Sequence, residues 1–554
     1  MQLKSQQRDI DWWQGALIYQ IYPRSFKDSN QDGIGDINGI ISKLDYLSWL
    51  GIDAIWISPF FTSPMRDFGY DVSDYRNVDP MFGTLQEFKL LLQKAHNLDI
   101  KIIIDQVISH SSSDHPWFTE SQKDKHNHYS DWYVWADPKA DGTAPNNWLS
   151  VFGGSAWQFN ARRGQYYLHH FLESQPDLNF FNPQVTQQLL ADIEFWLQLG
   201  VDGVRLDACN FYYHDDKLRD NPPVPPEQSL AKNVELSNPY AMQQHIFDIS
   251  RPQSLEFHKQ IRQLLDRYPG CISIGEIGAD DALKEMANYL NGGDKLHLAY
   301  TFDLLTTDFT AAAIYDIIDQ IQTNIGQYWP CLSYSNHDVV RTASRTATAG
   351  DPLQAFCVMA LLCSLRGSIC IYQGEELGLQ EAELSFEQLQ DPFGINFWPE
   401  FKGRDGCRTP MVWDDSLHGG FSNCAPWLPI ADSHWEHNVK AQTAIPNSLL
   451  NKIRLFWQWR AQQPALIKGK IQLIYQDKQL LVFTRNCPTQ QLLIAFNLSD
   501  KKVKAKVNQP FNSINGHGFD GDEEACSEAF TLRPWSGLYL DISAQSQPIN
   551  WIRI

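Results

Sequence analysis

The sequence has no apolar run long enough to cross a membrane. Its longest one lies near Ala355–Leu365 and is closed by Arg366, whereas a spanning helix needs about 20 apolar residues. The first residues, Met1–Asp11, are polar and contain no apolar stretch of the kind that a secretory signal needs. We therefore expect no membrane partner and a cytoplasmic location.

Positive charge is scarce as well. The chain carries 45 Lys and Arg residues against 65 Asp and Glu residues, so its net charge is −20. An acidic surface of this kind repels nucleic acid and anionic lipid, and we expect neither as a partner. The ten cysteines form no CxxC pair, and several lie inside apolar runs. That pattern is typical of reduced core thiols rather than of a metal site or a disulfide framework.

Nucleotide-binding signatures are missing, although apolar residues are plentiful. No GxGxxG or GxxxxGK(S/T) follows any apolar strand-like run, so we expect no organic cofactor. In contrast, 43% of the 554 residues are hydrophobic, and there are 30 Phe, 21 Tyr and 19 Trp. This composition is sufficient for a large folded core.

Eight short runs rich in β-branched residues alternate with stretches of helical periodicity. The runs are Leu17–Tyr22, Ala54–Pro59, Ile102–Val107, Val201–Leu206, Ile272–Glu276, Leu298–Phe302, Cys331–Tyr334 and Ile369–Gln373. The clearest helices between them are Leu85–Asn97, Gln184–Leu199, Leu255–Arg267 and Pro352–Leu365. Near-continuous apolar strands that alternate with helices are typical of a parallel sheet covered by those helices. Eight such units predict an α/β fold with a closed (β/α)8 TIM barrel rather than an open sheet.

Two connections of this barrel are too long to be simple loops. Residues 109–175 follow the third strand and are rich in Trp, Tyr, His, Pro and Gly, which predicts a small inserted domain above the barrel mouth. Residues 211–250 follow the fourth strand and contain the stiff segment Asn221–Pro226, which suggests a lid. Short alternating runs after about residue 465 predict a C-terminal antiparallel, sandwich-like β domain over 466–554. The barrel then comprises 1–108 and 176–465.

Polar residues gather where the predicted strands end. In a barrel of this type the active site lies at the carboxyl ends of the strands. Those ends carry several carboxylates, two histidines and one arginine, in Asp105–His110, Gly203–Asn210, Glu276 and Ser335–Asp338. Any one of them could be a salt bridge or a helix cap. Together they bring more charge to one mouth than a protein buries unless that charge is paired or used.

These motifs, in this order, resemble the α-amylase superfamily of glycoside hydrolases (family 13), and within it the branch of bacterial α-glucosidases and oligo-1,6-glucosidases. The motifs that carry the resemblance are Asp105–His110, Gln175–Asn179, Gly203–Asn210, Glu276 and Asn336–Asp338. Supporting stretches are Gly15–Phe26, Asp67–Asp71, Tyr372–Glu376 and Arg404–Pro410. Together they cover the barrel, whereas the C-terminal domain carries no such signature.

The resemblance implies a catalytic trio. Asp207 is then the nucleophile that forms a covalent glucosyl ester, and Glu276 is the general acid that later becomes the base. In a retaining enzyme their carboxyl groups lie about 5–5.5 Å apart. Asp338 is the third carboxylate, which binds sugar hydroxyls. Arg205 lies two residues before Asp207 and therefore on the same strand face, where it can orient that carboxylate.

The resemblance also implies a set of sugar-binding residues. Asp67 and Arg404 resemble the pair that closes the pocket behind the 4-hydroxyl, and Tyr70 resembles the aromatic platform. His110 and His337 resemble donors to the first sugar ring. Phe152 and Phe171 are further candidate pocket residues, although aromatics in a long loop are as often local packing. A closed pocket implies release of one glucose at a time from a non-reducing end.

A second constellation, Asp28–Asp36, follows the first strand. Oxygen-bearing side chains at alternate positions, with a glycine among them, suit a hard cation such as Ca²⁺ or Mg²⁺. The resemblance implies a structural ion held by side chains and one backbone carbonyl, from Asp28, Asn30, Asp32, Ile34 and Asp36. The alternative is an Asx-rich turn without a metal.

Ala208, directly after the expected nucleophile, bears on the linkage that is cleaved. In the family, Val at this position accompanies α-1,6 cleavage, and Ala or Thr accompanies α-1,4 cleavage. We therefore expect an α-glucosidase that prefers α-1,4 links in short oligosaccharides such as maltose. We expect it to be a monomer or a homodimer. The open alternatives are a glucosyltransferase or isomerase with the same acids, such as a sucrose isomerase or trehalose synthase, and a non-catalytic binding subunit.

Overall fold

The structure, a computed structural model, describes residues 10–225, 237–507, 512–519, 529–543 and 551–553. Its centre is a parallel sheet of eight strands in the order β11-β10-β9-β5-β2-β1-β13-β12. The end strands β11 and β12 lie next to each other, so the sheet forms a nearly closed barrel. The eight strands are β1 (Leu17–Ile21), β2 (Ala54–Ile57), β5 (Lys101–Gln106), β9 (Gly203–Leu206), β10 (Ile272–Ile277), β11 (Leu298–Thr301), β12 (Cys331–Leu332) and β13 (Ser368–Tyr372). The predicted (β/α)8 barrel is confirmed, and each of the eight predicted runs supplies one strand.

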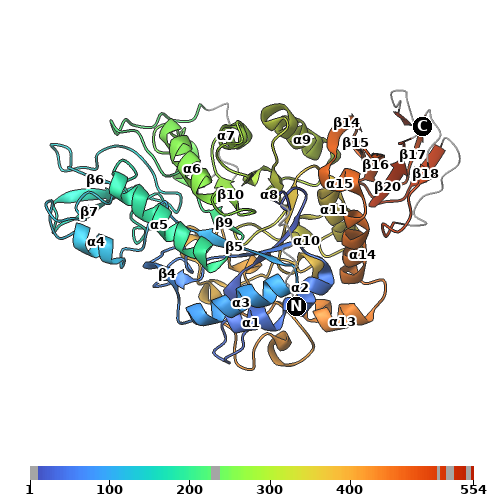
Figure 1. The fold of residues 1–554 in the computed structure, drawn as a ribbon, viewed down its shortest axis with the longest axis horizontal. Coiled ribbons are helices and arrows are strands. Elements are labelled where there is room, and N and C mark those ends of the chain that lie inside the picture. Colours follow the sequence, from blue (N-terminus) through green and yellow to red (C-terminus); the bar gives the residue numbers. More distant parts are fainter. Residues whose placement is uncertain (1–9, 226–236, 508–511, 520–528, 544–550, 554) are drawn as a thin grey trace, which may run out of the picture.

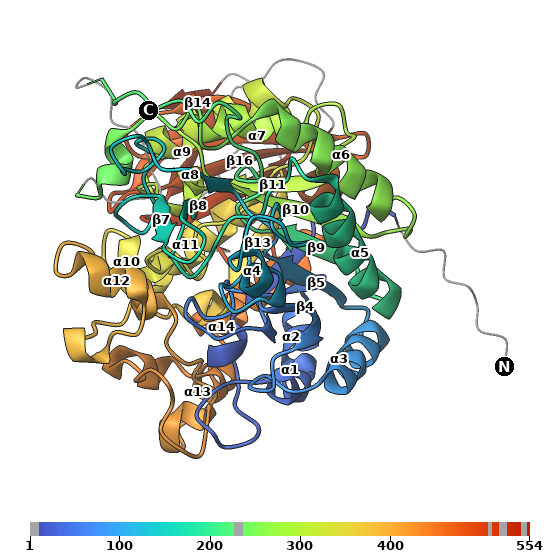
Figure 2. The same ribbon diagram turned by 90° about the vertical axis from the view of Figure 1, so that its left-hand side faces the viewer.

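Helices surround this sheet, as Figure 2 shows. The four predicted ones are α3 (Leu85–Asn97), α5 (Pro183–Leu199), α6 (Pro252–Leu265) and α11 (Pro352–Ser364). Local signals set their ends: α3 begins at a capping box made by Thr84 and Glu87, and α5 ends at Gly200, whose φ is 108°. The other helices are α1 (Ile37–Ser42), α2 (Leu44–Leu50), α7 (Ala282–Leu290), α8 (Phe302–Leu305), α9 (Ala311–Ile325), α10 (Thr342–Arg345), α12 (Pro392–Phe397), α13 (Val439–Ala444), α14 (Leu449–Ala461) and α15 (Pro464–Lys468).

The barrel strands are apolar because both of their faces are covered. Every residue of β1, β2, β9 and β13 is buried, as expected for parallel strands that have side chains inside the barrel and helices outside it. A long hairpin, β3 (Phe61–Thr62) with β4 (Asp74–Val78), follows β2. Between these two strands lies the loop that carries Asp67 and Tyr70.

Residues 109–175 contain a small sheet of their own. It has the order β6-β8-β7, and its strands are β6 (Trp135–Ala136), β7 (Trp157–Asn160) and β8 (Gln165–Leu168), preceded by the short helix α4 (Pro116–Ser121). These strands lie at one end of the long axis of the molecule, opposite the C-terminal sheets (Figure 1). The boundaries 109 and 175 stay a prediction.

The predicted lid, 211–250, contacts this inserted segment. Asn221 N donates to Asn147 Oδ1 at 2.8 Å, and Asn147 Nδ2 donates back to Asn221 O at 2.8 Å. Part of the lid prediction falls on residues 226–236, which lie outside the described residues. Its lid function stays a prediction.

The C-terminal part is antiparallel, as predicted. One sheet has the order β14-β15-β16-β20-β18, and a smaller one has the order β19-β17-β21. The strands are β14 (Lys470–Gln476), β15 (Leu480–Cys487), β16 (Gln490–Asn497), β17 (Val503–Val507), β18 (Asn512–Ser513), β19 (Ala529–Leu532), β20 (Ser536–Asp541) and β21 (Trp551–Arg553). Buried Val482 and Leu493 of the first sheet share a core with Val503 and Phe530 of the second.

A buried arginine joins this part to the barrel. Arg485 on β15 donates to the carbonyl oxygens of Ser364 and Leu365 at the end of α11, at 2.7 and 2.5 Å. Its other terminal nitrogen donates to the carbonyls of Leu466 and Gly469. None of the helices in the described part of the chain has both the length and the apolar character that a bilayer crossing requires.

Candidate active site

The polar strand ends converge at one rim of the barrel. Asp105 on β5 pairs in register with Arg205 on β9, and Glu276 on β10 pairs in register with Tyr300 on β11. Asp207 comes directly after β9. All five side chains are buried. Parallel strands place their carboxyl ends on the same side, so residues far apart in the chain become neighbours here.

Arg205 bridges three of these carboxylates. Its Nη1 lies 2.9 Å from Asp105 Oδ1 and 2.6 Å from Asp207 Oδ1, and its Nη2 lies 2.6 Å from Glu276 Oε1. The Arg205 side chain is 0% exposed. The guanidinium therefore holds Asp207 and Glu276 at the same place.

Glu276 is oriented by two further donors. Tyr300 OH donates to its Oε1 at 2.9 Å, and Ala208 N donates to its Oε2 at 3.2 Å. Tyr300 OH itself accepts from Arg205 Nη2 at 2.7 Å. In contrast, Asp207 Oδ2 accepts no hydrogen bond from any described side chain, so this oxygen is available to a ligand.

The charges of this group do not balance when all three acids are ionised. Burial raises the pKa of Asp207 and of Glu276, each to about 7, although Arg205 opposes the rise. Burial likewise raises the pKa of Asp105 to about 6 against the effect of Arg205. One guanidinium cannot neutralise three carboxylates, so the group retains a proton near neutral pH.

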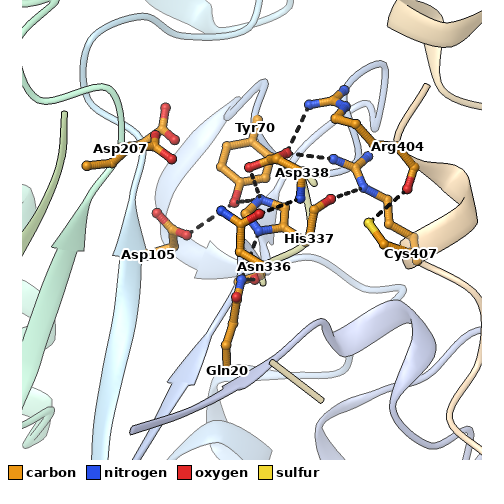
Figure 3. Close-up of polar contacts among 12 residues, drawn as sticks. Gln20, Tyr70, Asp105, Asp207, Asn336, His337, Asp338, Arg404 and Cys407 are labelled. Carbon is orange, nitrogen blue, oxygen red and sulfur yellow. Dashed lines mark hydrogen bonds and ion pairs between the residues drawn. The ribbon is translucent and has the colours of Figure 1, made fainter. Parts of the chain in front are cut away.

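Asp338 has the opposite electrostatics. Its Oδ1 lies 3.0 Å from Arg408 Nη2 and 3.3 Å from Arg404 Nη1. Figure 3 shows Arg404 and His337 beside Asp338. Burial alone would raise the pKa of this carboxyl, but His337, Arg404 and Arg408 hold it well below its ordinary value. Asp338 is therefore ionised at neutral pH.

His337 is a neutral hydrogen-bonding residue beneath the site. Burial lowers its pKa to about 3. Gln20 Nε2 donates to its Nδ1 at 2.8 Å, so the ring proton lies on Nε2, which faces Asp338 Oδ2 at 3.2 Å. The same nitrogen contacts Tyr70 OH, and the two rings are stacked with centroids 5.3 Å apart.

Asp67 and Arg404 are joined at one end of the site. Arg404 Nη2 donates to Asp67 Oδ1 at 2.8 Å, and Gln175 Nε2 donates to Asp67 Oδ2 at 3.0 Å. Gln175 also contacts His110 Nε2 at 3.2 Å. Burial lowers the pKa of His110, which favours its neutral form. Asp391 is a third carboxylate partner of Arg404, at 2.7 Å.

A cavity of about 340 Å³ opens among these residues. Of the predicted site residues, nine line it: Asp67, Tyr70, His110, Phe152, Phe171, Asp207, Glu276, Asp338 and Arg404. Arg205 and His337 lie behind that wall and contact residues of the lining. The structure thus brings all eleven predicted residues into one neighbourhood.

The aromatic candidates both line the cavity and pack locally. The rings of Phe152 and Phe171 meet edge to face, with centroids 5.7 Å apart. Phe152 also stacks on Phe393 at 4.8 Å, and Phe171 stacks on Phe211 at 5.4 Å. These four rings form an apolar wall between the inserted segment and the later loops.

Comparison with known proteins identifies the family. The sequence pattern of the alpha amylase catalytic domain matches residues 20–469. The chain belongs to the α-amylase family of glycoside hydrolases. The predicted resemblance is therefore confirmed.

The relatives within this family include α-glucosidases. A probable alpha-glucosidase from Rhizobium meliloti (strain 1021) is 52% identical over 519 residues, which cover 92% of this chain and 94% of that protein. An oligo-1,6-glucosidase from Parageobacillus thermoglucosidasius is 36% identical over 563 residues, which cover 95% and 98%. The crystal structure of the alpha-glucosyl transfer enzyme XgtA is similar with a TM-score of 0.94 and 52% identity, over 96% of this chain and 99% of that one. An isomaltulose synthase from Klebsiella sp. LX3 has a TM-score of 0.85 and 33% identity, over 96% and 99%.

Sequence reasoning missed several residues of this glycoside hydrolase site. Tyr300 lies inside the predicted strand Leu298–Phe302, two residues before its end, so the rule that selected Glu276 at a strand end does not select it. Gln175 and Arg408 lie inside recognised motifs but were given no role. Asp391 precedes a short helix in a late loop, and no local pattern distinguishes it.

The predicted metal loop is an internally hydrogen-bonded turn. Asp28 accepts from the backbone N–H groups of Asn30, Gln31 and Gly33. Asp32 Oδ1 accepts from Ile34 N at 2.8 Å. Its oxygens are of the type that Ca²⁺ and Mg²⁺ prefer. Each Asp32 oxygen accepts one hydrogen bond and keeps a lone pair, whereas each Asp28 oxygen accepts two. However, among the residues that the structure describes, no group of three or more His, Cys, Asp or Glu side chains is arranged to hold a metal ion. The ion stays a prediction.

The retained proton predicts the pH dependence of hydrolysis. A glycosidase needs one protonated and one ionised carboxyl group, and the pKa of Glu276 is raised to about 7. We expect kcat/KM for p-nitrophenyl α-glucoside to fall as the pH rises through about 7. Tyr300→Phe removes a hydrogen bond that favours ionised Glu276, so the alkaline limb should move to higher pH. An unchanged or lower alkaline limb in this variant would contradict the assignment.

Proposed function

We propose that this glycoside hydrolase is a retaining, exo-acting α-glucosidase that acts on short α-glucosides and transfers glucose to alcohols or sugars as well as to water. The observation that carries the proposal is the single guanidinium of Arg205, which holds Asp207 and Glu276 together at a cavity. A shared guanidinium keeps the two carboxyl groups close, as the about 5–5.5 Å separation of retaining glycosidases requires.

In the first step Asp207 Oδ2 attacks the anomeric carbon. The C1–O bond to the leaving group breaks as the ester bond to Asp207 forms, and Glu276 donates its proton to the leaving oxygen. In the second step Glu276, now ionised, takes a proton from water while the water oxygen displaces Asp207. An acceptor hydroxyl in place of water gives transfer instead of hydrolysis.

Asp338 stabilises the transition state in this scheme. It is kept ionised by Arg404 and Arg408, and positive charge develops on the sugar ring as the leaving group departs. A preorganised negative charge beside that ring lowers the barrier. Its oxygens also accept hydrogen bonds from sugar hydroxyls.

The Asp67–Arg404 pair makes the enzyme exo-acting. The two side chains are joined at 2.8 Å and line the cavity, so they block the sugar chain beyond the first ring. Only a terminal glucose fits between this pair and Asp207. Maltose and other short α-glucosides are the proposed substrates.

A dedicated transferase or isomerase is the second candidate. Two similar structures are those of an alpha-glucosyl transfer enzyme and an isomaltulose synthase. The observation in this chain that favours transfer is the apolar wall of Phe152, Phe171, Phe211 and Phe393, since apolar walls exclude water. Product analysis on sucrose and maltose distinguishes the candidates, because an isomerase converts sucrose without releasing equimolar glucose.

A cytoplasmic enzyme is part of the proposal. The nine cysteines in the described part of the chain are free thiols, and seven of them are buried. Free thiols are typical of proteins in a reducing compartment.

Retention is tested by the anomer that is released first. With p-nitrophenyl α-glucoside, we expect α-glucose as the initial product in NMR spectra, and initial β-glucose would overturn the mechanism. Asp207→Asn should lower kcat at least about 10³-fold, because it removes the nucleophile (about 4 kcal/mol in the barrier). The exposed Asp216→Asn is the matched control and should keep wild-type activity.

Linkage preference is tested at Ala208. Its side chain lines the cavity, and its backbone N–H contacts Glu276, so added methyl groups there change how the leaving sugar fits. We expect kcat/KM for maltose to exceed that for isomaltose about tenfold, and Ala208→Val to reduce this ratio. Initial rates on both disaccharides measure it. A wild-type preference for isomaltose would refute the α-1,4 assignment.

A structural divalent cation at Asp28–Asp36 is also proposed. Chelation with EDTA should lower Tm, and added Ca²⁺ or Mg²⁺ should restore it, because an ion that binds only the folded state stabilises by about 2.7 kcal/mol at 100 times its Kd. Asp32→Ala should make Tm insensitive to EDTA. If wild-type Tm does not respond to EDTA, the loop is an Asx-rich turn without a metal.

A further inference from the structure

Arg404 is delivered to the site by a closed loop. Asp391 caps the start of α12, and the chain returns to Arg404 twelve residues after Pro392. Where the two ends of this loop meet, a Cβ on Gly394 would lie 2.6 Å from Gly403 Cα, and a Cβ on Gly403 would lie 2.9 Å from Asp391 Oδ2. The two backbone segments can approach this closely only because both positions are glycine.

Asp391 binds Arg404 from the side that faces away from the cavity. Its Oδ1 accepts from Arg404 Nη2 at 2.7 Å, and its Oδ2 accepts from Arg404 Nε at 3.1 Å and from Arg404 N at 2.7 Å. The Asp391 residue is 0% exposed, and it is not part of the cavity lining. This two-oxygen contact fixes both the backbone and the plane of the guanidinium.

The remaining donors of Arg404 point toward the site. A guanidinium has five N–H groups; Asp391 takes one from Nε and one from Nη2, Asp67 takes the other Nη2 proton, and Asp338 takes one from Nη1. One Nη1 proton is left, on a residue that lines the cavity. The ring of Phe152 lies 5.0 Å from the guanidinium carbon and limits its tilt.

We propose that Asp391 is a positioning residue that aims this donor of Arg404 at the 4-hydroxyl of the bound glucose. The proposal rests on the proposed function and deepens it. Without Asp391, the two other carboxylates, Asp67 and Asp338, compete for a guanidinium that nothing holds from behind. Arg404 then changes its direction, and recognition of the 4-hydroxyl weakens, although Asp391 touches neither substrate nor reacting atoms.

The test compares two substrates that differ only at that hydroxyl, p-nitrophenyl α-glucoside and its 4-deoxy analogue. A site built to bind a hydroxyl rejects the analogue that lacks it. We expect wild-type enzyme to favour the glucoside about 100-fold in kcat/KM. Asp391→Asn should reduce this preference to about tenfold or less, mainly through a higher KM for the glucoside. A purely structural defect would lower both rates alike and keep the ratio.

Lys402→Gln is the matched control. Lys402 lies in the same loop, two residues from Arg404, and forms an exposed ion pair with Glu383. Loss of that pair should leave both the ratio and Tm unchanged. If Asp391→Asn keeps the wild-type ratio, or if Lys402→Gln loses it to the same extent, the proposal is wrong.

Two further measurements cover the other outcomes. Should Asp391→Asn fail to fold, Asp391→Ser decides, because Ser keeps an oxygen that can cap the start of α12 but removes the carboxylate that binds Arg404; a wild-type ratio in this variant overturns the proposal. Should the wild type fail to hydrolyse p-nitrophenyl α-glucoside, the proposed function is refuted. The role of Asp391 is then read from the Kd values of glucose and 4-deoxyglucose by calorimetry, where equal effects of Asp391→Asn on both sugars count against it.

Discussion

One buried guanidinium organises the reacting end of this molecule. Arg205 is enclosed by the barrel, with its guanidinium carbon 5.1 Å from the centre of the Trp56 ring. It contacts the carboxylates of Asp105, Asp207 and Glu276. Removing one partner of a buried ion pair costs about 3–5 kcal/mol. The carboxylates and the arginine therefore depend on each other: each is tolerated in the barrel because the other is there.

The two ends of the cavity differ in charge balance. Three carboxylates share Arg205, which leaves an excess of negative charge and a retained proton. Arg404 and Arg408 contact Asp338, and Arg404 also pairs with Asp67 and Asp391. This end therefore has two arginines for three carboxylates. In the proposed mechanism, one end therefore holds the proton that acid catalysis needs, and the other holds a permanent anion beside the sugar. In our proposal, the carboxylate of Asp391, which lies outside the cavity, orients the guanidinium of Arg404, which lines it.

The fold was largely predictable because parallel barrel strands are buried on both faces. Because of that constraint, the strands are continuous apolar runs in the sequence. Polar residues at the carboxyl ends of such runs, such as Asp105 and Glu276, are therefore easy to recognise. The ends of α3 and α5 were equally readable from Thr84 and Gly200, since capping is local. In contrast, Asp391 contacts Arg404 through a loop whose path depends on two facing glycines, and no periodicity encodes such a path.

Patterns along the chain were enough to predict the strands and helices, the polar strand ends and, through the motifs, the family. Each of these depends on interactions between residues that are close in the chain or on a pattern repeated along it. The folded chain was needed to show that Asp105 and Glu276 share Arg205 with Asp207, that Tyr300 contacts Glu276, and that His337 lies behind the cavity wall rather than in it. The physical reason is distance along the chain: Coulomb interactions and hydrogen bonds act over a few ångströms in space, and their partners here are separated by up to hundreds of residues.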